Sequence, residues 1–294
     1  MNSITLKAYA KINLGLDVLR KREDGYHDVC MIMQTIQLYD TLVIKKINDP
    51  QIVVKTNLPY LPTDQRNLVY RTAALFMEKF HLHHGVRIDL SKKIPVAAGL
   101  AGGSTDAAAV LKGMNQLYKT NLSTEELMKL GVVLGADVPY CLMMGTALSE
   151  GIGEILSPLA PMPSCHLLLV KPPISVSTKY VYENLKLDKS VLHPDIQRMI
   201  AALRDQNLND LTLHMDNILQ TVTEKDYPVI FEIKNMMQQK GAVKALMSGS
   251  GPTVFGIFTN RQSAEKAYQF FKSKSNGYQV FLTKPYWPEV RTSS

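Results

Sequence analysis

The segment Gly99–Ser104 has three glycines and leads into an alanine-rich run. Glycine lets a backbone approach a ligand closely, and the first turn of a helix offers unpaired N–H groups with roughly half a positive charge. Phosphate suits such an arrangement. The segment has neither the Gly-Lys-Ser/Thr of a P-loop nor a Rossmann fingerprint, so a nucleotide would bind here by another fold. For a single glycine-rich loop, an ordinary flexible connection is the alternative.

A second glycine cluster, Ser248–Pro252, precedes the apolar run Thr253–Phe258. Taken alone, such a cluster is a turn, because Gly and Pro mark turns in most proteins. Together, the two glycine-rich segments suggest two backbones that close over one ligand.

Lys11 and Asp137 are the ionisable candidates for catalysis. A lone Lys or Asp is usually a solvated surface charge, but these two stand among apolar or small residues, in Ala8–Leu16 and Gly135–Pro139. A carboxylate can take a proton from a hydroxyl, and an ammonium group can stabilise developing negative charge. The run His81–His84 has no neighbouring carboxylate or thiol, so no metal site is expected there.

The elements that position these residues begin with a strand. Every even position from Ile4 to Val18 is apolar, which places Lys11 and Asn13 side by side on the opposite face. A turn at Asp24–Gly25 and a strand-like run, Val29–Ile44, predict a hairpin.

Helical and strand patterns alternate through the rest of the chain, which indicates an α+β protein. A capping box at Ser123–Glu126 opens a helix that Gly135 can end, so Asp137 follows a helix terminus. The other expected helices are Asn67–Phe80, Ala107–Leu117, Ile196–Ala202, Val229–Gln239 and Ser263–Phe271. The other expected strands are Gly85–Leu90, His166–Val170, Ala242–Leu246, Val254–Phe258 and Tyr278–Thr283.

Length and composition indicate a soluble protein with two domains. The chain has 294 residues, of which 46% are hydrophobic and 20% charged. Three prolines between 157 and 163 mark the expected boundary, which gives domains 1–158 and 159–294. The first residues lack the pattern of a secretory signal, so a cytoplasmic location is expected.

Charge and cysteine content limit the partners. The net charge of +7 favours anionic partners, and nucleotides or phosphorylated metabolites explain it as well as nucleic acid does. There is no aromatic-interleaved basic stripe and no candidate membrane span. The three cysteines are an odd, widely spaced number without a Cys-x-x-Cys pair, which argues against a disulfide framework or a zinc site.

Three segments together resemble the signature segments of GHMP kinases: the strand that bears Lys11, the segment 95–109 and the segment 248–256. Within that superfamily, four stretches are similar to the branch that phosphorylates diphosphocytidyl-methylerythritol in the non-mevalonate isoprenoid pathway. They are Ala10–Leu14, Asp24–His27, Gly99–Ala107 and Gly135–Pro139. The similarity covers nearly the whole chain.

The resemblance implies an N-terminal, ATP-binding domain like the second domain of ribosomal protein S5 and a C-terminal, ferredoxin-like substrate domain, with the active site between them. ATP would be the phosphoryl donor. Asp106 is the only carboxylate near the glycine-rich loop, so Mg²⁺ would be carried mainly by the nucleotide rather than by protein ligands.

The resemblance also assigns roles to individual residues. Asp137 would be the catalytic base and Lys11 its partner, and the substrate would be bound by Asn13, Tyr26, His27, Asp137, Thr178 and Tyr182. Tyr180 competes with Tyr182 for the aromatic position near the cytidine. ATP would be bound by Asn67, Pro95, Val96, Ala97, Ala98, Gly99, Leu100, Ala101, Gly102, Gly103, Ser104 and Thr105.

Three alternatives remain at the level of sequence. Another GHMP kinase, of homoserine or mevalonate type, would share the ATP loop, but the segment Asp24–His27 argues against it. A non-catalytic metabolite sensor would not need both Lys11 and Asp137. A basic nucleic-acid-binding module would show binding to RNA that falls steeply with salt.

Overall fold

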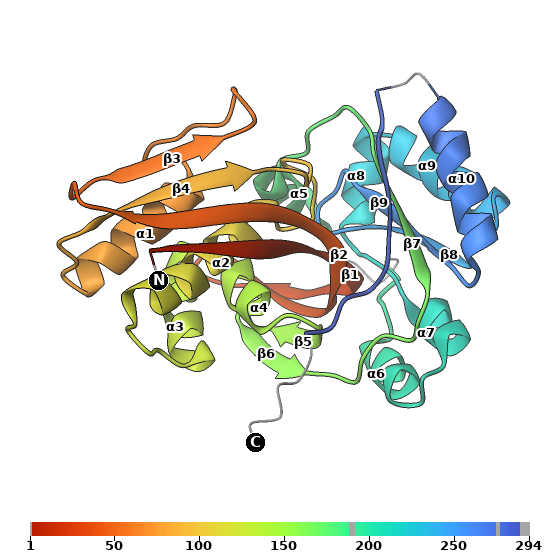
Figure 1. Cartoon of the computed structure of the whole chain (residues 1–294). Coiled ribbons are helices and arrows are strands. Elements are labelled where there is room, and N and C mark those ends of the chain that lie inside the picture. Colours follow the sequence, from red (N-terminus) through yellow and green to blue (C-terminus); the bar gives the residue numbers. More distant parts are fainter. Residues whose placement is uncertain (1, 188–191, 275–276, 289–294) are drawn as a thin grey trace. The chain divides into compact units, whose positions relative to one another are not determined.

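Strands β1 (Ser3–Lys21) and β2 (His27–Ile47) pair with each other and form the hairpin that the sequence predicts (Figure 1). The computed structural model describes residues 2–187, 192–274 and 277–288. Among these residues, no helix is long and apolar enough to cross a membrane.

Both faces of β1 are covered along its middle. The even positions from Ala8 to Val18 are at most 2% exposed, as the alternation predicts. The odd positions are covered as well, because Lys11 is 6% exposed and Asn13 is fully buried. Lys11 and Asn13 are therefore held inside the protein and not on its surface.

The chain forms two compact units, and β1 and β2 each run through both. Unit 1 comprises Met1–Ala10, Leu38–Val96 and Ala101–Met143. Unit 2 comprises Lys11–Gln37, Ala97–Leu100 and Met144–Ser294. The expected boundary between residues 158 and 159 stays a prediction, and residues 1, 188–191, 275–276 and 289–294 of the expected domains lie outside the described part.

Unit 1 is a small sheet with helices. Strand β4 (Gly85–Ser91) lies between β2, which is antiparallel to it, and β3 (Ile52–Thr56), which is parallel. The longest helix, α2 (Gly102–Tyr118), packs against the other three helices of the unit. These are α1 (Leu68–Lys79), α3 (Thr124–Leu134) and α4 (Asp137–Met143). The capping box at Ser123 is present, and Gly135 ends α3 as expected.

In unit 2, strand β5 (Thr146–Glu150) pairs with β2, and β6 (Ile155–Pro158) pairs with β5. A separate antiparallel sheet has the order β10-β7-β9-β8. Its strands are β7 (His166–Lys171), β8 (Lys244–Met247), β9 (Val254–Phe258) and β10 (Gln279–Thr283). In chain order this is 4-1-3-2, the ferredoxin-like arrangement that was expected.

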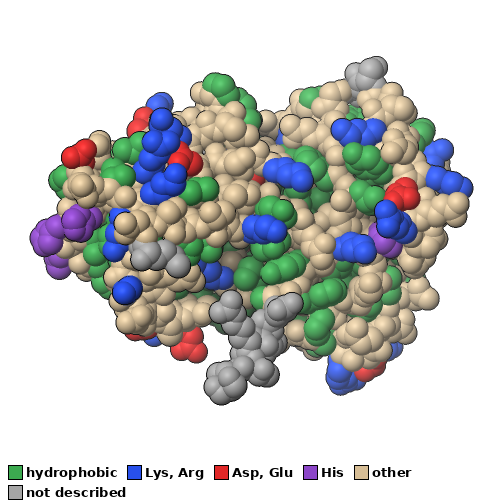
Figure 2. All heavy atoms as spheres, in the orientation of Figure 1, with side chains coloured by type: hydrophobic (Ala, Val, Ile, Leu, Met, Phe, Trp, Pro, Cys, Tyr) green, Lys and Arg blue, Asp and Glu red, His purple; other side chains and the backbone are tan. Residues whose placement is uncertain are grey.

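The helices of unit 2 include two that pack on this sheet, α9 (Val229–Gln239) and α10 (Arg261–Ser273). The others are α5 (Thr178–Asn184), α6 (Ile196–Arg204), α7 (Leu208–His214) and α8 (Gln220–Asp226). In Figure 2, the Lys and Arg side chains of the described residues are scattered singly and in small groups over the face shown. The positive charge on that face is therefore distributed rather than continuous.

Candidate active site

The glycine-rich loop ends in the first turn of α2. The helix begins at Gly102 and not at Ala107, so Gly102–Thr105 belong to the helix. No side chain caps this end, since its N-cap residue, Ala101, makes no side-chain hydrogen bond. The first N–H groups of a helix lack partners within it, so this end can bind an anion.

The two glycines at the start of α2 have different surroundings. A Cβ on Gly102 would lie 3.1 Å from Ile94 Cγ2 and 3.2 Å from Lys92 Nζ, whereas a Cβ on Gly103 would meet nothing within 4 Å. A side chain at Gly102 would therefore require Ile94 or Lys92 to shift by a few tenths of an ångström. Gly103 is exposed, and packing places no such demand on it.

Unit 2 brings parts of all three signature segments together. Lys11 Nζ donates a hydrogen bond to Asn13 Oδ1 at 2.8 Å, and Lys11 N donates to the carbonyl of Leu100 at 3.2 Å. Ser248 Oγ donates to the carbonyl of Gly99 at 2.9 Å. A Cβ on Gly249 would lie 3.6 Å from Asn13 Oδ1. Segments far apart in sequence thus meet around Asn13.

Gly99 explains why the two glycine-rich segments can meet. Its φ is +73°, a region that side-chain-bearing residues rarely adopt, and a Cβ there would lie 2.1 Å from the carbonyl oxygen of Ser248. The expectation that two glycine-rich backbones approach each other is confirmed at this position. That they close over a ligand stays a prediction.

Asp137 is the first residue of α4 and is half-buried. The helix is held from its other end, where the half-buried Lys112 of α2 donates to the carbonyl of Leu142 at 2.8 Å. Gly131 of α3 allows close packing, since a Cβ there would lie 2.8 Å from Val138 Cγ1. Asp137 thus starts a short helix that is fixed by its neighbours. It belongs to unit 1 and Lys11 to unit 2, so the pairing of the two stays a prediction.

Two of the residues expected near the cytidine lie in contact. The rings of His27 and Tyr182 have centroids 5.2 Å apart. Burial, with a contribution from Lys21, lowers the pKa of His27, which favours the neutral imidazole near pH 7. Tyr180 instead hydrogen-bonds Asp226, and this bond raises the pKa of Tyr180. Of the two competing tyrosines, Tyr182 therefore has the contact that fits the expected site.

The remaining expected residues have local partners. Tyr26 follows the hairpin turn and is 60% exposed. Thr178 and Ser250 share a hydrogen bond of 2.8 Å between their hydroxyls. Asn67 is the N-cap of α1: it accepts from Val69 N at 2.9 Å and donates to the carbonyl of Pro62 at 2.7 Å. An adenosine contact by Asn67 stays a prediction.

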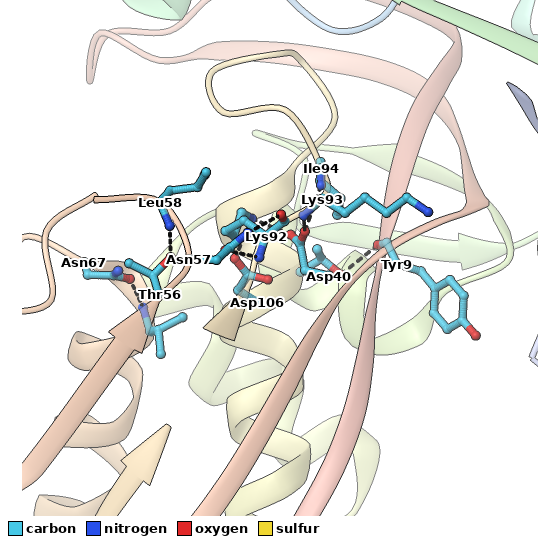
Figure 3. Close-up of polar contacts among 12 residues, drawn as sticks. Tyr9, Asp40, Thr56, Asn57, Leu58, Asn67, Lys92, Lys93, Ile94 and Asp106 are labelled. Atoms are coloured by element: carbon cyan, nitrogen blue, oxygen red, sulfur yellow. Dashed lines mark hydrogen bonds and ion pairs between the residues drawn. The ribbon is translucent and has the colours of Figure 1, made fainter. Parts of the chain in front are cut away.

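A polar cluster that the sequence analysis did not identify lies in unit 1 (Figure 3). Lys92 Nζ lies between two carboxylates: it contacts Asp40 and donates to Asp106 Oδ2 at 2.7 Å. The side chains are at most 5% exposed. Asp40 is 52 positions from Lys92 in sequence, so no spacing pattern connects them. Only the position of Asp106 beside the glycine-rich loop gave a signal.

The charges of this cluster follow from its burial. Burial would lower the pKa of Lys92, but the charges of Asp106 and Asp40 outweigh it and the net shift is upward. Burial, reinforced by the like charge of Asp40 and opposed by Lys92, raises the pKa of Asp106 to about 8. Near pH 7, the raised pKa favours the neutral form of Asp106.

Comparison with known proteins identifies the class. Residues 67–145 match the GHMP kinases N terminal domain, and residues 190–277 match the GHMP kinases C terminal domain. The chain belongs to the GHMP kinase family. Its α+β, two-domain fold is that of this family, as expected.

Within this family, the chain is similar over nearly its whole length to enzymes of one name. The 4-diphosphocytidyl-2-C-methyl-D-erythritol kinase of Lachnoclostridium phytofermentans is 57% identical over 97% of this chain and 98% of its own length. The enzyme of the same name from Lachnospira eligens is 53% identical, over 98% of this chain and 100% of its own. A crystal structure of 4-(cytidine 5'-diphospho)-2C-methyl-D-erythritol kinase has a TM-score of 0.83 at 32% identity and covers 97% of this chain and 100% of that chain.

A mevalonate kinase of known structure is similar in fold alone. The mevalonate kinase of L. major has a TM-score of 0.77 at 17% identity, over 97% of each chain. The backbone alone therefore does not separate the members of this family by substrate.

Proposed function

We propose that this chain transfers the γ-phosphoryl group of ATP to the 2-hydroxyl of 4-diphosphocytidyl-2-C-methyl-D-erythritol. The observation that carries the proposal is the convergence of the three signature segments around Asn13, in a chain 57% identical to a kinase of that name over nearly its full length. Homoserine and mevalonate kinases are not favoured, because their similarity is confined to the fold.

The first turn of α2 is the proposed phosphate site. Its unpaired N–H groups and the positive end of the helix dipole suit the anionic phosphates of ATP. Gly103 is exposed there, so a ligand can approach the backbone without meeting a side chain at that residue. The proposed ATP contacts of the segment 95–105 rest on this arrangement.

Phosphoryl transfer proceeds through a loose transition state, so positioning and charge stabilisation supply most of the catalysis. Asp137 is proposed to accept the proton of the attacking hydroxyl. Lys11 is proposed to stabilise negative charge on the reacting oxygens. Its hydrogen bond to Asn13 supports this role, because it fixes the direction of a buried ammonium group. Asn13 is proposed to contact the methylerythritol unit.

The cytidine is proposed to lie near His27 and Tyr182. A neutral imidazole can donate one hydrogen bond and accept another, which suits the edge of a base, and a tyrosine offers a π face. Tyr26, exposed at the hairpin turn, and Thr178 would complete this end of the substrate site.

Mg²⁺ is proposed to arrive with ATP. Within the described residues, no group of three or more His, Cys, Asp or Glu could hold a metal ion. Asp106 does not fit the role of ligand, because Lys92 occupies one of its oxygens and the other is closed off from solvent. Mg²⁺ usually keeps several waters, which this buried carboxyl could not accommodate. The expected cytoplasmic location also stays a prediction.

A kinase assay on the purified protein tests the proposal. The panel contains ATP with diphosphocytidyl-methylerythritol, mevalonate, homoserine or galactose, and the formation of ADP is followed. We expect turnover with the first acceptor alone. Turnover with another acceptor would assign a different function, and turnover with none would support the sensor alternative.

A further inference from the structure

The cluster of Asp40, Lys92 and Asp106 has no part in the proposed chemistry, yet its contacts fall at both ends of the glycine-rich loop (Figure 3). At the start of the loop, Asp40 Oδ1 accepts from the backbone N–H groups of Lys93 and Ile94, the latter at 2.8 Å. At its end, Lys92 holds Asp106, which lies in α2 directly after the segment 95–105.

We propose that Asp40, Lys92 and Asp106 form a clamp that positions the phosphate-binding loop and thereby sets its affinity for ATP. The inference rests on the proposed function, since it takes this loop to be the ATP site. The three are positioning residues, because none of them is proposed to touch ATP.

The loop needs such a constraint. Ala97 and Ala101 have φ angles of 50° and 55°, a left-handed conformation that is unfavourable for a residue with a Cβ. Such conformations persist only where the surrounding structure enforces them. The clamp fixes the chain on both sides of these two residues.

The contacts of the clamp are also of a kind that resists movement. Its charges are buried, so separating Lys92 from Asp40 would leave each without solvent or a partner charge. Lys92 Nζ also lies against the start of α2, 3.2 Å from where a Cβ on Gly102 would be. A loop held in this way has its N–H groups arranged before ATP binds, which reduces the entropy lost on binding.

Two substitutions at Asp106 test whether the hydrogen bond between Lys92 and Asp106 sets the affinity for ATP. Asp106→Ala removes the acceptor for Lys92 at the α2 end but leaves the Lys92–Asp40 pair, so no buried charge loses its partner. Asp106→Asn keeps an oxygen that can accept the same bond, and resembles the neutral carboxyl present near pH 7. We expect the Ala variant to bind ATP roughly ten- to hundredfold more weakly and the Asn variant to bind nearly as the wild type does.

The matched control is Arg87→Met. Arg87 pairs with Asp89 at 2.9 Å on β4, the strand that leads to Lys92, and is not one of the three residues of the clamp. Its loss should leave ATP affinity unchanged. Lys92→Met is the second variant, and should weaken ATP binding at least as much as Asp106→Ala.

Calorimetry with ATP, melting temperatures and the KM of the acceptor are measured on the same preparations. Weaker ATP binding by folded Asp106→Ala, an unchanged acceptor KM and recovery in Asp106→Asn support the clamp. Wild-type ATP affinity in folded Asp106→Ala or Lys92→Met overturns it while the proposed function stands. A wild-type protein that binds no ATP would instead overturn the proposed function.

Discussion

Single residues carry the chemistry, and Asp137 is the one on which the proposed proton transfer depends. Asn has nearly the same shape but cannot accept the proton. Asp137→Asn should therefore lower kcat by roughly 10²- to 10⁴-fold, with little change in either KM or in melting temperature. Single-turnover rates and melting curves on one preparation measure this. A normal single-turnover rate per folded molecule would show that Asp137 has a structural role only. A fall in rate of less than about tenfold would mean that substrate positioning and Lys11 contribute most of the catalysis.

Tyr26 tests the cytidine end of the site. Because its side chain is 60% exposed, its removal should hardly change stability. Tyr26→Ala should weaken acceptor binding by about 1–3 kcal/mol, the range for stacking against a base, and leave the KM of ATP unchanged. Tyr60→Ala, which removes a tyrosine that is 71% exposed in unit 1, is the control and should change neither constant. Equal losses for both substrates after Tyr26→Ala would contradict the placement.

For single residues, the sequence predicts the face of a strand on which a side chain lies better than it predicts whether that side chain is buried. Alternation correctly placed Lys11 and Asn13 side by side on one face of a strand. Their burial could not be foreseen, because it depends on segments distant in sequence, such as the loop that contains Gly249. The cluster of Asp40, Lys92 and Asp106 was not predicted for the same reason, because Asp40 is distant from Lys92 in sequence.

Among the elements, α2 matters most, because it connects the proposed phosphate site with the rest of unit 1. Alanine-rich spacing predicted its body but placed its start at Ala107. The first turn was not predicted because it contains two glycines, which have low helix propensity. Contacts such as the hydrogen bond from Thr105 Oγ1 to the carbonyl of Tyr9 hold that turn in place. Strands β3, β5 and β6, which are four or five residues long, were not predicted from the sequence.

Gly103→Ala tests the N-terminus of α2. A Cβ there meets no protein atom within 4 Å, and alanine favours a helix by up to about 1 kcal/mol over glycine, so the variant should be as stable as the wild type or more so. If phosphate lies against this turn, ATP binding measured by calorimetry should weaken.

A substitution to alanine at the exposed Lys129 of α3, Lys129→Ala, is the control for Gly103→Ala and should leave ATP binding unaltered. Gly102→Val should also abolish ATP binding, but it crowds Ile94 and Lys92 and therefore tests packing at the same time. Full ATP affinity in Gly103→Ala would move the nucleotide away from this turn.

For the molecule as a whole, the sequence predicts the fold class, whereas the expected domain boundary stays a prediction. Periodicity indicated the α+β class, and β9 and α9 have the bounds expected for them. A boundary inferred from prolines assumes that each domain is one continuous segment. The compact units are each built from three segments, because β1, β2 and the glycine-rich loop each pass from one unit to the other, and no local signal marks such an arrangement.

Stability of the whole protein should depend on pH through Asp106. Its pKa is raised from 3.8 to about 8, so the native state holds a proton that the unfolded state releases. The resulting stabilisation is complete below about pH 4, falls as pH rises and is gone above about pH 8. Asp106→Asn cannot titrate. Urea unfolding at about pH 5 and about pH 9 should therefore show the wild type losing stability relative to this variant at the higher pH. A constant difference between the two proteins would contradict the raised pKa.

The position of the transferred phosphate tests the central claim most directly. The proposed product carries its new phosphomonoester on the tertiary carbon of the methylerythritol unit, which bears no hydrogen. Phosphorus NMR of the product made from ATP and diphosphocytidyl-methylerythritol should therefore show a new phosphomonoester signal without coupling to a carbinol proton. A signal split by such a proton would mean that another hydroxyl is phosphorylated, and the absence of any new phosphomonoester would contradict the proposed activity.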